Sequence, residues 1–117
     1  MILPEPKASF QRLFNRLSAP YSRLVFSRLQ RETRQDVAWI GPRAGERVLD
    51  VACGPGTLAL ELARCGCRVF ACDLAEQMVA QAHRAARARR CLPLRLAVAD
   101  AEQLPLAAES FDLVTCA

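Results

Sequence analysis

Apolar and polar positions alternate between two patterns along the second half of the chain. Short apolar runs, rich in β-branched and aliphatic residues, have the length and character of buried strands; they cover residues 47–52, 67–72, 94–99 and a run that begins near Phe111. Longer stretches of good helix formers lie between them, at 57–65 and 75–89. Strands separated by single helices predict an α/β fold with a parallel sheet and right-handed crossovers.

The first third of the chain has a different pattern. Apolar residues recur at helical spacing over residues 8–17, and Pro20 can begin a second amphipathic helix. A loop rich in glycine and proline follows at 41–47. We therefore predict an N-terminal helical segment over residues 1–45 and an α/β unit over residues 46–117.

The segment VLDVACGPGTLALELA, residues 48–63, carries the strongest functional signal. An apolar strand runs into a turn with two glycines, and a helical stretch follows at once. Gly54 and Gly56 allow a sharp turn and a close approach of a ligand to the backbone. Thr57 stands where a helix N-cap is expected. The backbone N–H groups of such a loop point at a bound ligand, so the segment predicts a nucleotide-cofactor site.

Three acidic residues stand at or beside the ends of successive predicted strands: Asp50, Asp73 and Asp100. In an open parallel sheet these ends face one crevice in which ligands bind, so the three carboxylates can converge on one cofactor. Asp73 is placed to accept hydrogen bonds from ribose hydroxyls, and Asp100 can accept one from an exocyclic amine such as adenine N6. Each of them alone is equally typical of a helix cap or a turn.

The loop alone does not decide the cofactor. It satisfies the loose G-x-G-x-x-G/A pattern of dinucleotide-binding folds at Gly54, Gly56 and Ala59. Asp50, however, would repel a nearby pyrophosphate and attract a cation. S-adenosylmethionine carries an ammonium and a sulfonium and has no phosphate, so it fits this loop better than NAD does.

The runs VLDVACGPGT, VFACDLAEQMVAQA and DAEQLPLAAESFDLV resemble the successive motifs of class I S-adenosylmethionine-dependent methyltransferases, most closely the ubiquinone/menaquinone biosynthesis type. The resemblance implies a cofactor site built from Asp50, Ala52, Cys53, Gly54 and Gly56 at the methionine part, Asp73 at the ribose, and Leu74, Met78, Asp100 and Ala101 at the adenine. Met78 also fits an ordinary core position. Ala52 departs from the family, which often has glycine there.

The resemblance spans residues 46–117 and implies a Rossmann-like class I methyltransferase fold that stops after the fourth parallel strand. A sheet ending on a long apolar edge is unusual, so we interpret the chain as the cofactor-binding part of a methyltransferase with a small-molecule acceptor. Its catalytic residues would lie beyond Ala117. Two alternatives stay open: an NAD(P)-dependent oxidoreductase fragment, and a non-catalytic module whose fourth strand pairs with a partner chain or with a second copy.

The composition limits which partners, metals and cellular locations we expect. The net charge of +4 is modest and comes almost wholly from arginine, and no nucleic-acid recognition motif accompanies it, so we expect no nucleic-acid partner. The six cysteines lack zinc-site spacing, which predicts free thiols and no bound metal. No apolar run reaches the ~20 residues of a membrane span. We expect a cytoplasmic protein; the acid-free, arginine-rich residues 7–31 leave organelle import as the alternative.

Overall fold

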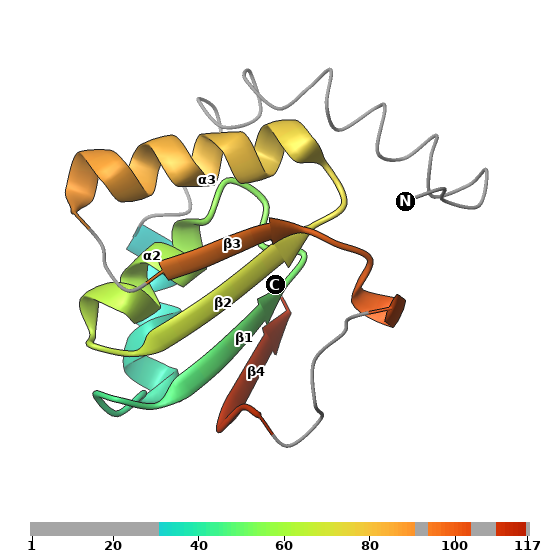
Figure 1. Cartoon of the computed structure of the whole chain (residues 1–117). Coiled ribbons are helices and arrows are strands. Elements are labelled where there is room, and N and C mark those ends of the chain that lie inside the picture. Colours follow the sequence, from blue (N-terminus) through green and yellow to red (C-terminus); the bar gives the residue numbers. More distant parts are fainter. Residues whose placement is uncertain (1–30, 91–93, 104–109, 117) are drawn as a thin grey trace.

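The computed structural model describes residues 31–90, 94–103 and 110–116. Its elements follow the order β1 (Arg47–Val51), α2 (Thr57–Arg64), β2 (Arg68–Asp73), α3 (Glu76–Arg89), β3 (Leu94–Val98), the short 3-10 helix η1 (Ala101–Gln103) and β4 (Leu113–Cys116) (Figure 1). Residues 31–40 are helical as well. The predicted strands and the helices between them are confirmed to within about two residues. The helices predicted at 8–17 and from Pro20 lie outside the described residues.

All four strands are parallel and form one sheet in the order β3-β2-β1-β4. The strands are therefore added outward from β1 to β3, and β4 lies on the other side of β1. This change of direction beside β1 is where open α/β sheets hold their ligands. The predicted Rossmann-like α/β fold is confirmed in the part of the chain that the structure describes.

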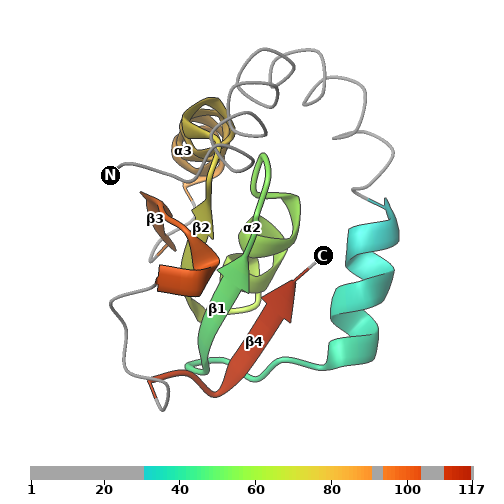
Figure 2. The same ribbon diagram turned by 90° about the vertical axis from the view of Figure 1, so that its right-hand side faces the viewer.

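The core lies between the sheet and the helices. Leu60 and Leu62 of α2 are fully buried in one cluster with Val48 of β1 and Val69 of β2. Val37, from the helix at 31–40, belongs to the same cluster. Figures 1 and 2 agree that this helix and α2 lie on the same side of the sheet. The described end of the N-terminal segment is thus packed onto the α/β unit.

The end of α2 is set by Gly66. Gly66 has a φ of +88°, a conformation that costs glycine little. Its N–H donates to the carbonyl of Ala63, and the N–H of Cys67 donates to the carbonyl of Leu62. This pair of bonds is a Schellman motif, which satisfies the last carbonyls of the helix. It turns the chain directly into β2, whose end carries the next acidic residue.

Candidate cofactor site

The glycine-rich loop between β1 and α2 takes three positive φ angles, at Ala52 (55°), Gly54 (57°) and Gly56 (86°). Gly56, in the left-handed region, is the N-cap of α2, and Thr57 is the first helical residue. The expectation that Thr57 caps the helix is therefore wrong. The Thr57 hydroxyl is buried instead and has no hydrogen-bond partner among the residues that the structure describes. Ala52, where the family often has glycine, holds a conformation that strains a residue with a Cβ.

The two glycines serve different purposes. A Cβ placed on Gly56 would lie 2.8 Å from the Cβ of Ala82, so this glycine lets the start of α2 approach α3. A Cβ placed on Gly54 would meet nothing within 4 Å. Gly54 therefore faces open space, where a ligand can approach the backbone, while Gly56 is needed for packing.

Asp73, the last residue of β2, fixes the loop in place. The Gly54 N–H donates to its Oδ2 at 2.9 Å, and the Ala75 N–H donates to its Oδ1 at 2.8 Å. These bonds join the glycine-rich loop to the start of α3. An ionised carboxylate has about four lone-pair positions, so Asp73 can still accept from ribose hydroxyls. Its predicted position at the strand end is confirmed.

Asp50 lies inside β1, one residue before the strand ends, and the residue is only 1% exposed. The hydroxyl of Thr115, on β4, donates to its Oδ1 at 2.8 Å. Burial raises the pKa of Asp50 from 3.8 to about 6; the Thr115 hydrogen bond lowers the pKa and the charge of Asp73 raises it further. Sequence reasoning missed Thr115. The register of two parallel strands, Asp50 opposite Thr115, is what brings the pair together.

Replacing Thr115 with valine should raise the pKa of Asp50 further, because its hydrogen bond, which lowers that pKa, is lost while the side-chain volume is kept. Titration of the Asp50 carboxyl by carbon NMR would measure this. Thr115→Ser keeps the hydroxyl and serves as the control. An unchanged Asp50 pKa in the valine variant would contradict the role given to this bond.

Asp100 follows β3 and is 3% exposed. Its Oδ1 accepts the Glu102 N–H at 3.0 Å and its carbonyl accepts the Gln103 N–H at 2.9 Å, so it opens η1, which begins at Ala101. Leu74 lies half-buried between β2 and α3. Met78 is 1% exposed inside the core. Contacts of these residues with adenine stay predictions, and the burial of Met78 matches its alternative interpretation as a core residue.

A cavity of about 220 Å³ opens beside the glycine-rich loop. Its walls come from β1, the loop, the start of α2 and the helix at 31–40, and the described residues that line it are Glu32, Thr33, Asp36, Asp50, Ala52, Cys53, Gly54, Pro55, Thr57 and Leu58. Glu32, Thr33 and Asp36 were not predicted as site residues. The only signal in the sequence is the spacing of Glu32 and Asp36, which are four residues apart and therefore share one face of a helix. Of the residues that the sequence analysis assigns to the cofactor, Asp50, Cys53 and Gly54 lie together at this cavity.

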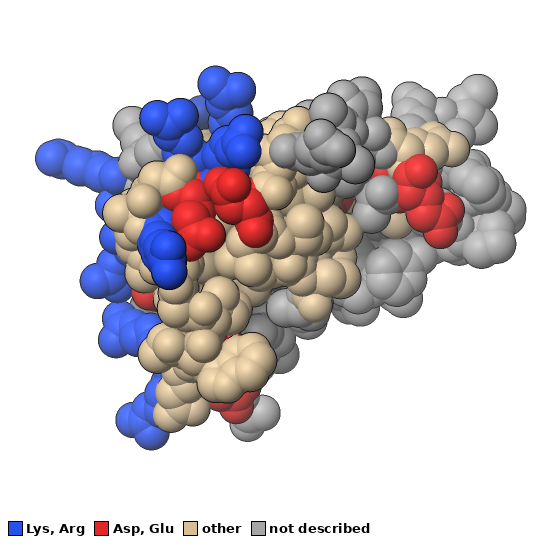
Figure 3. All heavy atoms as spheres, turned by 90° about the horizontal axis from the view of Figure 1, so that it is seen from below, with Lys and Arg blue, Asp and Glu red and all other residues tan. Residues whose placement is uncertain are grey.

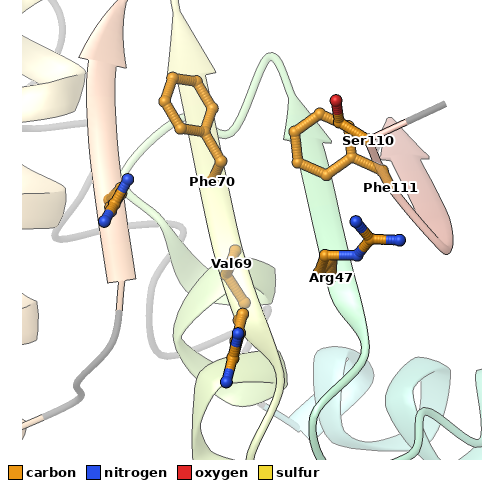
Figure 4. Close-up of a pocket in the computed structure, with 7 residues that line it drawn as sticks. Arg47, Val69, Phe70, Ser110 and Phe111 are labelled. Atoms are coloured by element: carbon orange, nitrogen blue, oxygen red, sulfur yellow. The ribbon is translucent and has the colours of Figure 1, made fainter. Parts of the chain in front are cut away.

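A larger cavity, of about 540 Å³, lies at the other end of the sheet. Arg47, Phe70 and Phe111 are among its lining residues, and Figure 4 shows the two rings over the sheet with Arg47 beside Phe111. Arg47 contacts Asp112 at 3.4 Å there. Figure 3 looks at the end where the strands begin, and basic side chains gather along one side of it. This cavity is remote from the carboxyl ends of the strands, where such folds bind ligands.

Five cysteines within the described ranges are free thiols, as the sequence predicts: Cys53, Cys65, Cys67, Cys72 and Cys116. Burial raises the pKa of Cys53, with the charges of Asp50 and Asp73 adding to the effect. The Cys53 thiol therefore stays protonated and acts as a small apolar residue just after β1. Within the same ranges, no helix has both the length and the apolarity of a bilayer-spanning segment.

Comparison with known proteins identifies the class. A family model described as a methyltransferase domain matches residues 48–117, and the chain belongs to this family. It is 42% identical over 92 residues to a demethylmenaquinone methyltransferase from Beutenbergia cavernae, covering 79% of this chain and 35% of that protein. It is 41% identical over 86 residues to a 23S rRNA (uracil(1939)-C(5))-methyltransferase from Pseudomonas entomophila, covering 69% of this chain and 19% of that protein.

The fold comparison agrees. The structure matches the magnesium protoporphyrin IX methyltransferase of Synechocystis PCC 6803, solved with bound SAH, with a TM-score of 0.79 and 25% identity, covering 94% of this chain and 57% of that one. The Rossmann-like fold of class I methyltransferases is thereby confirmed for this chain. The chain spans about a third of the length of the demethylmenaquinone methyltransferase that it matches.

Proposed function

We propose that this chain carries the S-adenosylmethionine-binding part of a methyltransferase. The observation that carries the proposal is the convergence of a glycine-rich loop and three carboxylates at one edge of the sheet. Asp73 bonds to the Gly54 N–H, which joins the ribose-binding position to the loop, and Asp50 lies buried beneath the same loop. Membership of the methyltransferase domain family supports the assignment.

The residues fit this cofactor better than a dinucleotide. Buried Asp50 and the acidic lining of the 220 Å³ cavity present negative charge next to the loop, which favours a cationic ligand and repels a pyrophosphate. Neither the oxidoreductase alternative nor the non-catalytic module gains support from the relatives.

When bound, S-adenosylmethionine supplies a methyl group on a sulfonium, which a carbon, oxygen or nitrogen nucleophile can displace. The contribution of this chain is alignment and electrostatics, which can account for much of the acceleration of such a displacement. The rigid link from Asp73 to the loop holds the ribose position against the methionine position. Asp50 and its neighbours supply negative potential near the cationic part of the cofactor.

We expect the purified protein to bind S-adenosylhomocysteine (SAH) and S-adenosylmethionine, and to bind NAD⁺ far more weakly or not at all. Isothermal titration calorimetry with the three ligands tests this directly. SAH serves as the reference because it is not consumed. Tight binding of NAD⁺ without binding of SAH would overturn the proposal and restore the oxidoreductase interpretation.

The acceptor is proposed to be a small molecule, as in the demethylmenaquinone methyltransferase relative. The rRNA methyltransferase relative shows that this family also serves a nucleic-acid acceptor, while the modest net charge of +4 disfavours one here. A cytoplasmic location and pairing through β4 stay predictions. Transfer of a labelled methyl group from S-adenosylmethionine into RNA rather than into low-molecular-weight material would contradict the small-molecule acceptor.

A further inference from the structure

The larger cavity, of about 540 Å³ at the start of the strands, is lined by an arginine from each of three adjacent strands. These are Arg47 of β1, Arg68 of β2 and Arg95 of β3, and we call the space between them the arginine cavity. A guanidinium keeps its charge at any ordinary pH. The described lining residues include no aspartate or glutamate. The arginine cavity therefore presents positive charge.

The register of the sheet places these cations on one face. Arg47 lies directly opposite Arg68, and Arg95 lies directly opposite Phe70. Phe70 follows Arg68 by two residues, and side chains alternate between the faces of a sheet. The three guanidinium groups and the Phe70 ring therefore project from the same face, opposite to the one on which α2 and α3 pack.

The positive charges are poorly balanced within the protein. Like charges directly opposite each other destabilise a pair of strands, and Arg47 and Arg68 form such a pair. Arg47 contacts Asp112 at 3.4 Å, but the two side chains are 52% and 41% exposed, so this ion pair is weak. In the described part of the chain, no ion pair involves Arg68 or Arg95. A bound anion would relieve the repulsion.

Two aromatic rings are a second feature of the arginine cavity, independent of its charge. Phe70 and Phe111 both line it and are half-buried. Figure 4 shows the two rings over the same face of the sheet. Rings that are partly exposed offer surfaces on which a flat, unsaturated ring can stack. A ligand that combines an anionic group with such a ring would use both features.

Size and charge narrow the choice of occupant. Pockets for whole small ligands have volumes of roughly 300–1,000 Å³, and about 540 Å³ lies within this range. A second copy of this chain would bring its own three arginines to the face and be repelled. An inorganic anion would leave the rings unused. A nucleotide has a phosphate, which arginine binds through two parallel hydrogen bonds, and a base that stacks.

We propose that the arginine cavity binds a free nucleotide. Arg68 and Arg95 donate hydrogen bonds to its phosphates, and Arg47 adds positive charge beside them. The base stacks on the rings of Phe70 and Phe111. This site lies at the opposite end of the strands from the glycine-rich loop, so it is a second ligand site and does not rest on the proposed cofactor.

Calorimetric titration of the full chain with GDP tests the proposal. GDP lacks the adenine of the proposed cofactor, and any base is a suitable probe because stacking tolerates all of them. Guanosine lacks the phosphates and pyrophosphate lacks the base. GDP should bind at least about tenfold more tightly than either, since it makes both sets of contacts. Excess SAH should leave its affinity unchanged.

Substitutions separate the two halves of the site. Arg68→Gln and Arg95→Gln should each lower the affinity for GDP about fivefold, and less at high salt, without affecting guanosine. Phe70→Leu should weaken GDP and guanosine and spare pyrophosphate. Arg84→Gln removes the same charge from an exposed position on α3 and is the matched control, with no expected effect.

Asp112→Asn supplies a readout that damage to the fold would not give. The change removes the carboxylate that competes for Arg47, while the amide oxygen can still accept the Arg47 N–H. Affinity for GDP should therefore rise, by about twofold for an exposed pair. A structural role alone would lower the affinity or leave it as it is.

Four results would overturn the proposal. The first is a wild-type protein that does not bind GDP, and the second is a GDP affinity unchanged in both arginine variants. The third is loss of GDP binding in excess SAH, which would place GDP at the glycine-rich loop. The fourth is much tighter binding of an oligouridylate than of GDP, which would reassign the arginine cavity to a nucleic-acid strand. The proposed cofactor is tested separately, by SAH binding alone.

Discussion

Replacing Gly56 with alanine is expected to lower the free energy of unfolding by about 2–4 kcal/mol, the sum of left-handed backbone strain and overpacking. Both contributions are visible in the structure. Gly56 has a φ of +86°, and a Cβ there would lie 2.8 Å from the Cβ of Ala82 and 3.5 Å from its Cα. The 2.8 Å contact is the clash, and because the Cβ of Ala82 has no rotamer to change, the backbone of α2 or α3 must shift to relieve it. Urea unfolding followed by circular dichroism measures the loss.

Gly54→Ala is the matched control, because it adds the same atom in the same loop. Gly54 has a φ of +57° and open space where its Cβ would lie, so only the strain applies and the loss should be about 1 kcal/mol. Its effect on SAH binding should be the larger of the two, since the added methyl enters the space that a ligand uses. Equal destabilisation by both substitutions would mean that packing against Ala82 does not matter.

The contrast between Gly54 and Gly56 shows which features of the loop could be predicted from the sequence and which could not. The G-x-G spacing correctly predicts a turn, a helix start and a ligand loop, because these follow from local backbone preferences. Which glycine packs and which faces the ligand depends on Ala82, which belongs to the next helix. The wrong N-cap at Thr57 has a related cause: side-chain preference favours threonine at a cap, but the loop arrives at the helix with Gly56 in the left-handed region.

The site residues also divide into those that local sequence patterns predict and those that only tertiary packing reveals. Asp73 and Asp100 were predictable because strand ends can be located from periodicity, and parallel strands put their carboxyl ends on one edge. Thr115 could not be assigned, since only the register of β4 on β1 places it opposite Asp50. Glu32 and Asp36 are ordinary helix-surface acids in sequence. Only the packing of Val37 in the core turns their face toward the loop.

Replacing Asp50 should have the second large effect on stability. Here the free energy of unfolding should rise, whereas Gly56→Ala lowers it. The folded-state pKa is raised from 3.8 to about 6 by burial, so between these values the native state binds more protons than the unfolded state. Stability therefore falls as pH rises through this window, and the cost of about 3 kcal/mol is complete above it. Asp50→Asn, whose amide oxygen can still accept from Thr115, should stabilise the protein by about 2–3 kcal/mol at pH 8.

Urea unfolding at pH 8 and pH 4.5 checks this prediction, because the gain should shrink toward the acid side, where Asp50 itself is protonated. Asp112→Asn is a control of opposite sign: the N–H of Arg47 lowers the pKa of the exposed Asp112, so its removal gives no gain at pH 8.

The same Asp50→Asn protein should bind S-adenosylmethionine more weakly, since a buried charge beside the cavity is lost. If instead stability and affinity moved together, Asp50 would be a structural residue. A gain in stability with a loss of affinity would mean that its charge, costly to the free protein, acts on the ligand.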